Sequence, residues 1–62
     1  MTLIEIMAEV GIAIELKSDP YRVLRLRKNR MRQGSSMRRA LETLLKQDID
    51  YLIMASAKVV EL

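Results

Sequence analysis

The tripeptide Ser18-Asp19-Pro20 divides the chain and constrains where its elements can lie. Asp is a favoured helix N-cap, Pro at the first helical position gives up only an N–H that has no partner there, and Pro disfavours helical geometry in the preceding residue. A helix is therefore expected to begin at Pro20 and to run to about Gln33, with Gly34 as its left-handed terminator.

The segment before this break begins with a capping box. Thr2 and Glu5 have the spacing at which a Thr hydroxyl accepts from the backbone of the Glu, while that carboxylate reaches back. Apolar residues then recur at helical spacing up to Gly11. Over residues 12–17 apolar and polar residues alternate, so this stretch either continues the helix to about Lys17 or forms a short strand; its length and aliphatic composition favour the helix. A β-hairpin of residues 12–17 and 22–27 is a further alternative.

The segment after Gly34 is expected to form one long helix. Ser35 or Ser36 would cap it, and it would run from about Met37 to Val60. Residues 51–60 are apolar on nearly every side, and two short companion helices cannot cover that much surface. The excess predicts a two-fold homodimer along residues 49–60, with an interface made by Ile49, Leu52, Ile53, Val59 and Val60.

The chain has little to stabilise it besides its core and a partner. Its 62 residues form a single domain, 1–62, and one core of that size gives only a few kcal/mol. Cys and His are absent, which excludes disulfides and the common zinc ligand sets. Half of the residues are apolar, without Phe or Trp, so the core must be aliphatic. These features predict a mainly α-helical, three-helix subunit that dimerises and has a long C-terminal helix.

The same inventory gives no support for an enzyme. There is neither a nucleophile–base pair at a recognisable spacing nor a phosphate loop, so we expect no catalytic residues, no metal site and no cofactor. No apolar run approaches the roughly 18 residues of a membrane span. The acidic first residues lack the positive region of a signal peptide. A cytoplasmic protein without a membrane partner is expected.

Basic residues are concentrated in the middle of the chain. Residues 20–41 hold eight cations and no acid, whereas the flanks hold all eight acids and three Lys, for a formal net charge of +3. On the predicted second helix, one stripe at helical spacing consists of Arg22, Arg25, Lys28 and Arg32. Such a stripe can neutralise phosphates and release counterions, which predicts binding to DNA or RNA. The alternatives are a match to acids of this chain or of a protein partner, or a solvated face.

Arg38 and Arg39 fall in the first turn of the predicted long helix, where the helix dipole disfavours cations. Their placement suggests either a phosphate held at that helix start or a chance surface pair.

Asp48 falls within the apolar stripe of the same predicted helix. An unpaired buried carboxylate is costly, so Asp48 is expected to pair with Arg27 or Arg30, which intrude on the apolar arc of the second helix.

One family resemblance covers residues 12–50. Its elements are Ile12–Leu16, Asp19-Pro20, a helix, Gly34-Ser35-Ser36, and the apolar pairs Ala40-Leu41 and Leu44-Leu45. This order resembles the ribbon-helix-helix repressors. The resemblance implies that Ile12–Leu16 is a strand paired with its dimer mate, that Ala13, Glu15 and Lys17 face DNA, and that the dimer binds an operator.

The sequence as a whole favours a small regulatory nucleic-acid-binding homodimer. Its phosphate contacts would come from Arg22, Arg25, Lys28, Arg32, Arg38 and Arg39. The rival function is a protein-interaction module, an inhibitor or adaptor, whose basic helix docks on an acidic partner.

Overall fold

The computed structural model describes residues 1–61 and the side chains of residues 1–59. Over these residues the regular structure is helical: α1 (Leu3–Glu15), α2 (Pro20–Arg30), α3 (Ser36–Leu45) and α4 (Ile49–Glu61). The prediction of a mainly α-helical chain is confirmed.

The predicted capping residues fix where the first three helices begin. Thr2 Oγ accepts from the Glu5 backbone N–H at 3.2 Å, while Glu5 Oε1 accepts from the Thr2 N–H at 3.2 Å, so the capping box is complete. Asp19 caps α2, with Pro20 as its first residue, and Ser35 caps α3. These short-range hydrogen bonds satisfy N–H groups that have no partner within the helix.

Residues 12–15 continue α1, as the favoured interpretation predicts, and the strand and hairpin alternatives are not formed. The same residues are therefore helical where the ribbon-helix-helix resemblance implies a strand. The helix ends when Lys17 adopts a left-handed conformation with φ of 57°. The N–H groups of Lys17 and Ser18 then bond to the carbonyls of Ile14 and Ala13, at 3.0 and 2.8 Å, which closes a Schellman motif.

The prediction of a single long third helix is wrong. The chain turns at residues 46–48, so the described part of the chain contains α3 and α4 in its place. Asp48 starts the new helix, because its Oδ1 accepts from the Tyr51 backbone N–H at 2.8 Å. The turn is also tied to α2, since the Tyr21 hydroxyl donates to the Gln47 carbonyl at 2.7 Å.

Asp48→Ala is expected to destabilise the protein by about 1 kcal/mol, the usual cost of losing a helix N-cap. Asp48 is exposed, so no buried charge is left behind when it is removed. Urea denaturation measures the difference. Asp48→Asn keeps an acceptor oxygen and should lose much less; a loss of several kcal/mol in both variants would contradict a simple capping role.

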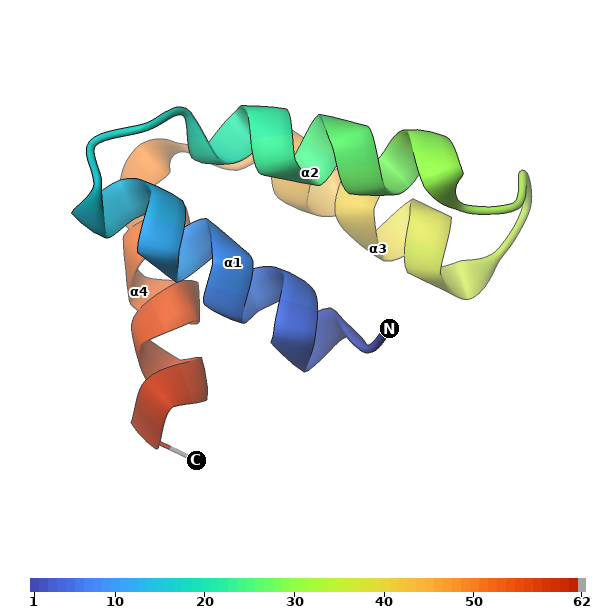
Figure 1. Ribbon diagram of the computed structural model, residues 1–62. Helices are drawn as coiled ribbons and strands as arrows, with labels where there is room; N and C mark the ends of the chain where they lie inside the picture. Colours follow the sequence, from blue (N-terminus) through green and yellow to red (C-terminus); the bar gives the residue numbers. More distant parts are fainter. Residues whose placement is uncertain (62) are drawn as a thin grey trace.

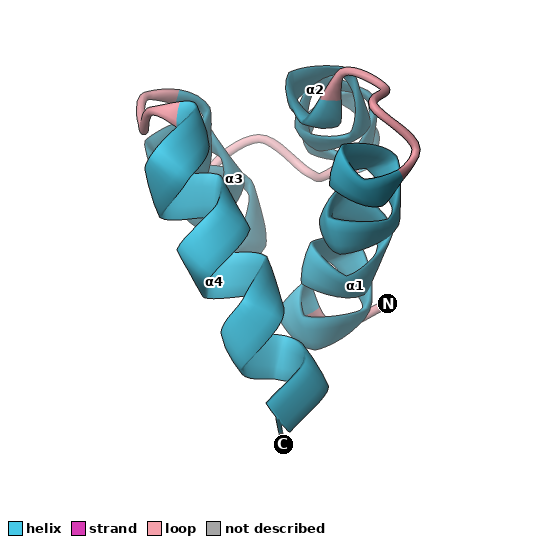
Figure 2. Cartoon of the chain, turned by 90° about the vertical axis from the view of Figure 1, so that its left-hand side faces the viewer, coloured by secondary structure: helices cyan, strands magenta, loops and turns pink. Residues whose placement is uncertain are grey.

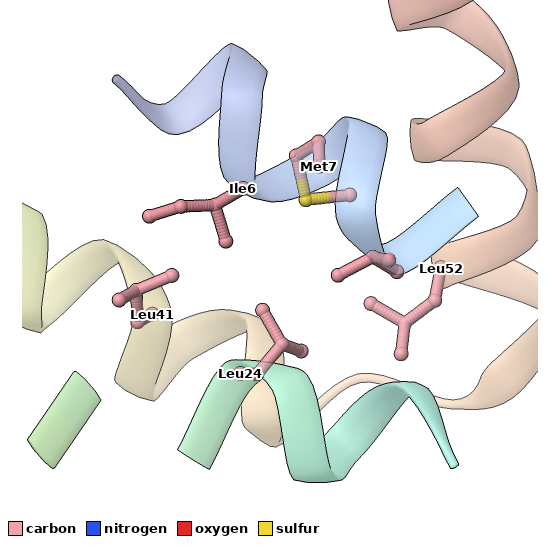
Figure 3. Close-up of a cluster of buried hydrophobic side chains, with 6 residues drawn as sticks. Ile6, Met7, Leu24, Leu41 and Leu52 are labelled. Atoms are coloured by element: carbon pink, nitrogen blue, oxygen red, sulfur yellow. The ribbon is translucent and has the colours of Figure 1, made fainter. Parts of the chain in front are cut away.

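The four helices of the described residues pack around a small core. α2 lies along one side of the molecule with α3 running back beneath it, while α1 packs against both α2 and α4 (Figures 1 and 2). The buried apolar cluster draws from every helix: Ile6, Met7 and Val10 from α1, Leu24 from α2, Leu41 from α3 and Leu52 from α4 (Figure 3). The core is aliphatic, as the composition requires.

α1 and α4 meet at two small residues, Gly11 and Ser56. Ser56 is buried, and its hydroxyl donates to the Ile53 carbonyl of its own helix at 3.1 Å. A Cβ placed on Gly11 would lie 3.4 Å from the Ser56 Cβ, so the two helices approach closely at this point. Gly11, where the helical spacing of apolar residues in the first segment stops, therefore lies at the contact between α1 and α4.

Candidate nucleic-acid interface

The outward face of α2 is a continuous exposed surface. Its five exposed side chains within the helix are Arg22, Arg25, Leu26, Asn29 and Arg30. The opposite side of the helix faces α1 and α3, and there Leu24 is fully buried. Because α2 forms an outer edge of the molecule (Figure 1), a large partner can reach this surface. We call these five residues the α2 face.

The predicted stripe coincides only in part with the α2 face. Arg22 and Arg25 belong to it, and Arg32 is exposed in the loop that follows, whereas Lys28 is half-buried at its edge. Arg25 lies 3.3 Å from the carboxylate of Asp19, but about half of each side chain is exposed to solvent. An ion pair so exposed is weak, so Arg25 stays available to another anion.

Arg30 lies on the α2 face, where the sequence analysis did not place it. It is exposed one helical turn after the exposed Leu26, and it therefore adds a cation to this surface. No sequence signal reveals this, because the apolar residues of α2 spread too broadly to show that Leu26 and Arg30 lie on its outward side.

Arg27 and Asp48 have partners other than those predicted. Arg27 binds the carboxylate of Glu9 on α1 through two nitrogens, with Nε donating to Oε2 at 3.0 Å. This half-buried pair joins α1 to α2, while Asp48 caps α4. The predicted pairing of Asp48 with Arg27 or Arg30 is not formed: Arg27 pairs with Glu9 instead, and the turn at residues 46–48 brings Asp48 to the surface as a cap.

Arg38 closes the C-terminus of α2. Its Nη1 donates to the carbonyl oxygens of Met31 and Lys28, at 3.2 and 3.4 Å, and its Nε lies 3.4 Å from Glu42 Oε1. A cation is favourable at the negative end of a helix, so Arg38 stabilises the turn between α2 and α3. Nothing local in the sequence reveals this contact, because it crosses the turn.

Arg39 is exposed and donates to the Gly34 carbonyl at 2.9 Å. Gly34 has the predicted left-handed conformation, with φ of 84°, which an L side chain rarely adopts. It does not end α2, however, because that helix stops at Arg30, with Met31 as its C-cap, rather than at about Gln33. Of the two predicted phosphate ligands on this helix, Arg38 is engaged in hydrogen bonds that hold the turn between α2 and α3, whereas Arg39 is exposed.

The predicted dimer residues divide into two groups. Leu52 is fully buried in the core, which leaves no surface of it for an interface, whereas Val59 packs against that core and is only partly buried. Ile49 and Ile53 are exposed, and the side chain of Val60 lies outside the described residues. Ile53 lines an apolar groove of about 380 Å³ between α1 and α4, together with Gly11, Ile12 and Ala57 among others.

None of the helices in the described part of the chain is long and apolar enough to cross a bilayer. Comparison with protein-family models, curated proteins and solved structures gives no match for this chain. The inference of function therefore depends on the chemistry of the α2 face.

Proposed function

We propose that the protein is a small regulatory nucleic-acid-binding protein whose α2 face contacts the phosphate backbone. One observation carries the proposal: α2 and the loop after it present four exposed cations, Arg22, Arg25, Arg30 and Arg32, in a segment that contains no acid. The exposed Arg39 lies on the helix that follows, which widens the positive region.

Charge on this surface is left uncompensated by the fold. Of the acids, Glu9 is matched by Arg27 and Glu42 by Arg38, two cations outside the α2 face. Within the face, Arg25 has its exposed contact with Asp19. The remaining guanidinium groups can donate two parallel hydrogen bonds to phosphate oxygens and displace condensed counterions.

Salt dependence tests the phosphate contacts. Four contacts to duplex DNA give a slope of about −3.6 in a plot of log affinity against log salt, at about −0.9 per phosphate. Arg22→Ala and Arg32→Ala should each reduce the slope by about one and leave the melting temperature unchanged, because both side chains are exposed. Fluorescence anisotropy with mixed-sequence DNA and RNA fragments measures the slopes.

Lys58→Ala is the matched control, since Lys58 is an exposed cation on α4. It should leave the slope unaltered. The proposal fails if no polyanion binds at low salt, or if the α2 variants change binding no more than Lys58→Ala does; the basic surface would then be assigned to an acidic protein partner.

We propose further that the protein acts as a homodimer formed through α1 and α4. The support is a group of exposed isoleucines on these two helices: Ile4, Ile12, Ile49 and Ile53. Large exposed apolar patches mark interaction surfaces, and a core with so few fully buried side chains gains most from a second copy. In Figure 1, α4 extends away from α2, so this association leaves the α2 face uncovered.

A further inference from the structure

Leu26 is an apolar side chain on the α2 face, and phosphate binding does not require one. It is 53% exposed, and its neighbours one helical turn before and after are Arg22, Asn29 and Arg30. A single exposed Leu is ordinary. An exposed Leu with cations and one amide as its neighbours on the helix is a specific chemical combination.

These residue types match the edges of base pairs. In the major groove of DNA, Arg donates to guanine O6 and N7, Asn pairs with adenine N6 and N7, and an apolar side chain contacts the C5 methyl group of thymine. The α2 face offers all three types within two helical turns. A surface built only to neutralise phosphates would need the cations alone.

We infer that α2 enters the major groove of duplex DNA, with Leu26 against a thymine methyl group and Asn29 on an adenine edge. This inference rests on the proposed nucleic-acid binding and names its substrate as duplex DNA that contains A·T pairs. The four exposed cations of the proposed function then contact the phosphates beside the groove: Arg22, Arg25, Arg30 and Arg32.

The shape of the molecule favours this groove over other nucleic acids. A helix with its side chains is about 10–12 Å across, which matches a major groove about 12 Å wide. α2 stands at the outside, above α1 and α3 in Figure 1 and above α1 in Figure 2. Duplex RNA has a deep and narrow major groove that side chains do not read.

Single strands are disfavoured by the absence of stacking groups on the α2 face. Proteins that bind single strands stack bases on aromatic side chains. Tyr21 is the aromatic residue of α2, but it is half-buried and its hydroxyl is bonded to the Gln47 carbonyl. Tyr51 lies in the first turn of α4 and is not part of the α2 face.

Replacing thymine by uracil tests the Leu26 contact, because it removes only the C5 methyl group. The probes are a short duplex of alternating adenine and thymine and the same duplex with uracil in place of thymine. The wild-type protein should bind the thymine duplex about fivefold more tightly, the scale expected for burying one methyl group. Leu26→Ala should bind both duplexes equally, close to the wild-type affinity for the uracil duplex.

Asn29→Ala tests the adenine contact on the same probes. It should weaken binding to the thymine duplex about tenfold, while the thymine-to-uracil ratio persists because Leu26 is intact. Neither Leu26→Ala nor Asn29→Ala should alter the salt slope, since neither side chain contacts a phosphate. Arg22→Ala is the matched control: it should weaken binding to both duplexes alike and lower the slope.

The outcomes separate this inference from the proposal on which it rests. If the wild-type protein binds thymine, uracil and duplex RNA probes with equal affinity, or if Leu26→Ala keeps the wild-type ratio, insertion into the major groove is refuted while the salt slope still supports phosphate binding. If none of the probes binds at low salt, both are refuted. Because both side chains are exposed, circular dichroism should find the Leu26 and Asn29 variants folded.

Discussion

Leu24→Ala is expected to leave much of the protein unfolded at room temperature. Leu24 is fully buried, and it lies among core side chains that include Ile6, Leu41 and Leu52 from the other helices (Figure 3). Truncating a buried Leu to Ala costs about 2–5 kcal/mol, and a domain of this size has only a few kcal/mol to lose. The helical signal in circular dichroism, followed against urea, measures the loss.

Leu26→Ala is the matched control because it makes the same chemical change in the same helix. Leu26 is exposed, so its removal should change the free energy of unfolding by less than about 0.5 kcal/mol. Equal stability of the two variants would contradict the packing of α2 on the core. The contrast also supports the DNA experiment, since it establishes that Leu26→Ala reports on binding rather than on folding.

The helix starts could be predicted because capping is a local property. Thr2, Asp19 and Ser35 each bond to a backbone N–H two or three residues later, so residue type and spacing are sufficient. The continuation of α1 beyond Gly11 was also predictable, because length and composition favoured a helix. Capping and composition predict no more of the fold than these helix starts and this continuation.

The helix ends and the turn before α4 could not be predicted in the same way. α1 ends at Glu15, and the residue that takes the left-handed conformation after it is Lys17, where Gly is usual. Asp19-Pro20 limits how far this helix can run, but residue type does not mark its exact end. The turn at residues 46–48 contains neither Gly nor Pro. One of the bonds that hold it, from Tyr21 to Gln47, joins residues 26 positions apart. Asp48 was consequently interpreted as a buried charge in a long helix rather than as a cap.

The positive charge of the candidate site could be predicted from the sequence, but which cations belong to the site could not. The sequence places eight cations between two acidic flanks, but each cation's availability depends on a tertiary partner. Arg27 is paired with Glu9, 18 positions away, and Arg38 donates to the Met31 carbonyl at the end of α2. Arg30 is exposed because α1 and α3 pack against only one side of α2. The pattern of apolar residues on α2 was too broad to show which side that is.

The second large effect is expected at Ile53, where Ile53→Glu should convert the proposed dimer to a monomer. Ile53 is 45% exposed and lines the apolar groove between α1 and α4. The exposure of Ile53 predicts that the subunit stays folded, because the carboxylate can remain in water when the partner leaves.

The size of the effect follows from symmetry. A two-fold interface contains the substitution twice, so a cost of about 2 kcal/mol in each copy raises the dissociation constant roughly a thousandfold. Sedimentation at micromolar concentration should find a dimer for the wild-type protein and a folded monomer for Ile53→Glu. Leu26→Glu places the same charge on an apolar side chain of similar exposure outside the groove, and it should leave the dimer intact. A wild-type protein that sediments as a folded monomer would contradict the proposed dimer, and equal dissociation by both variants would move its interface away from the groove.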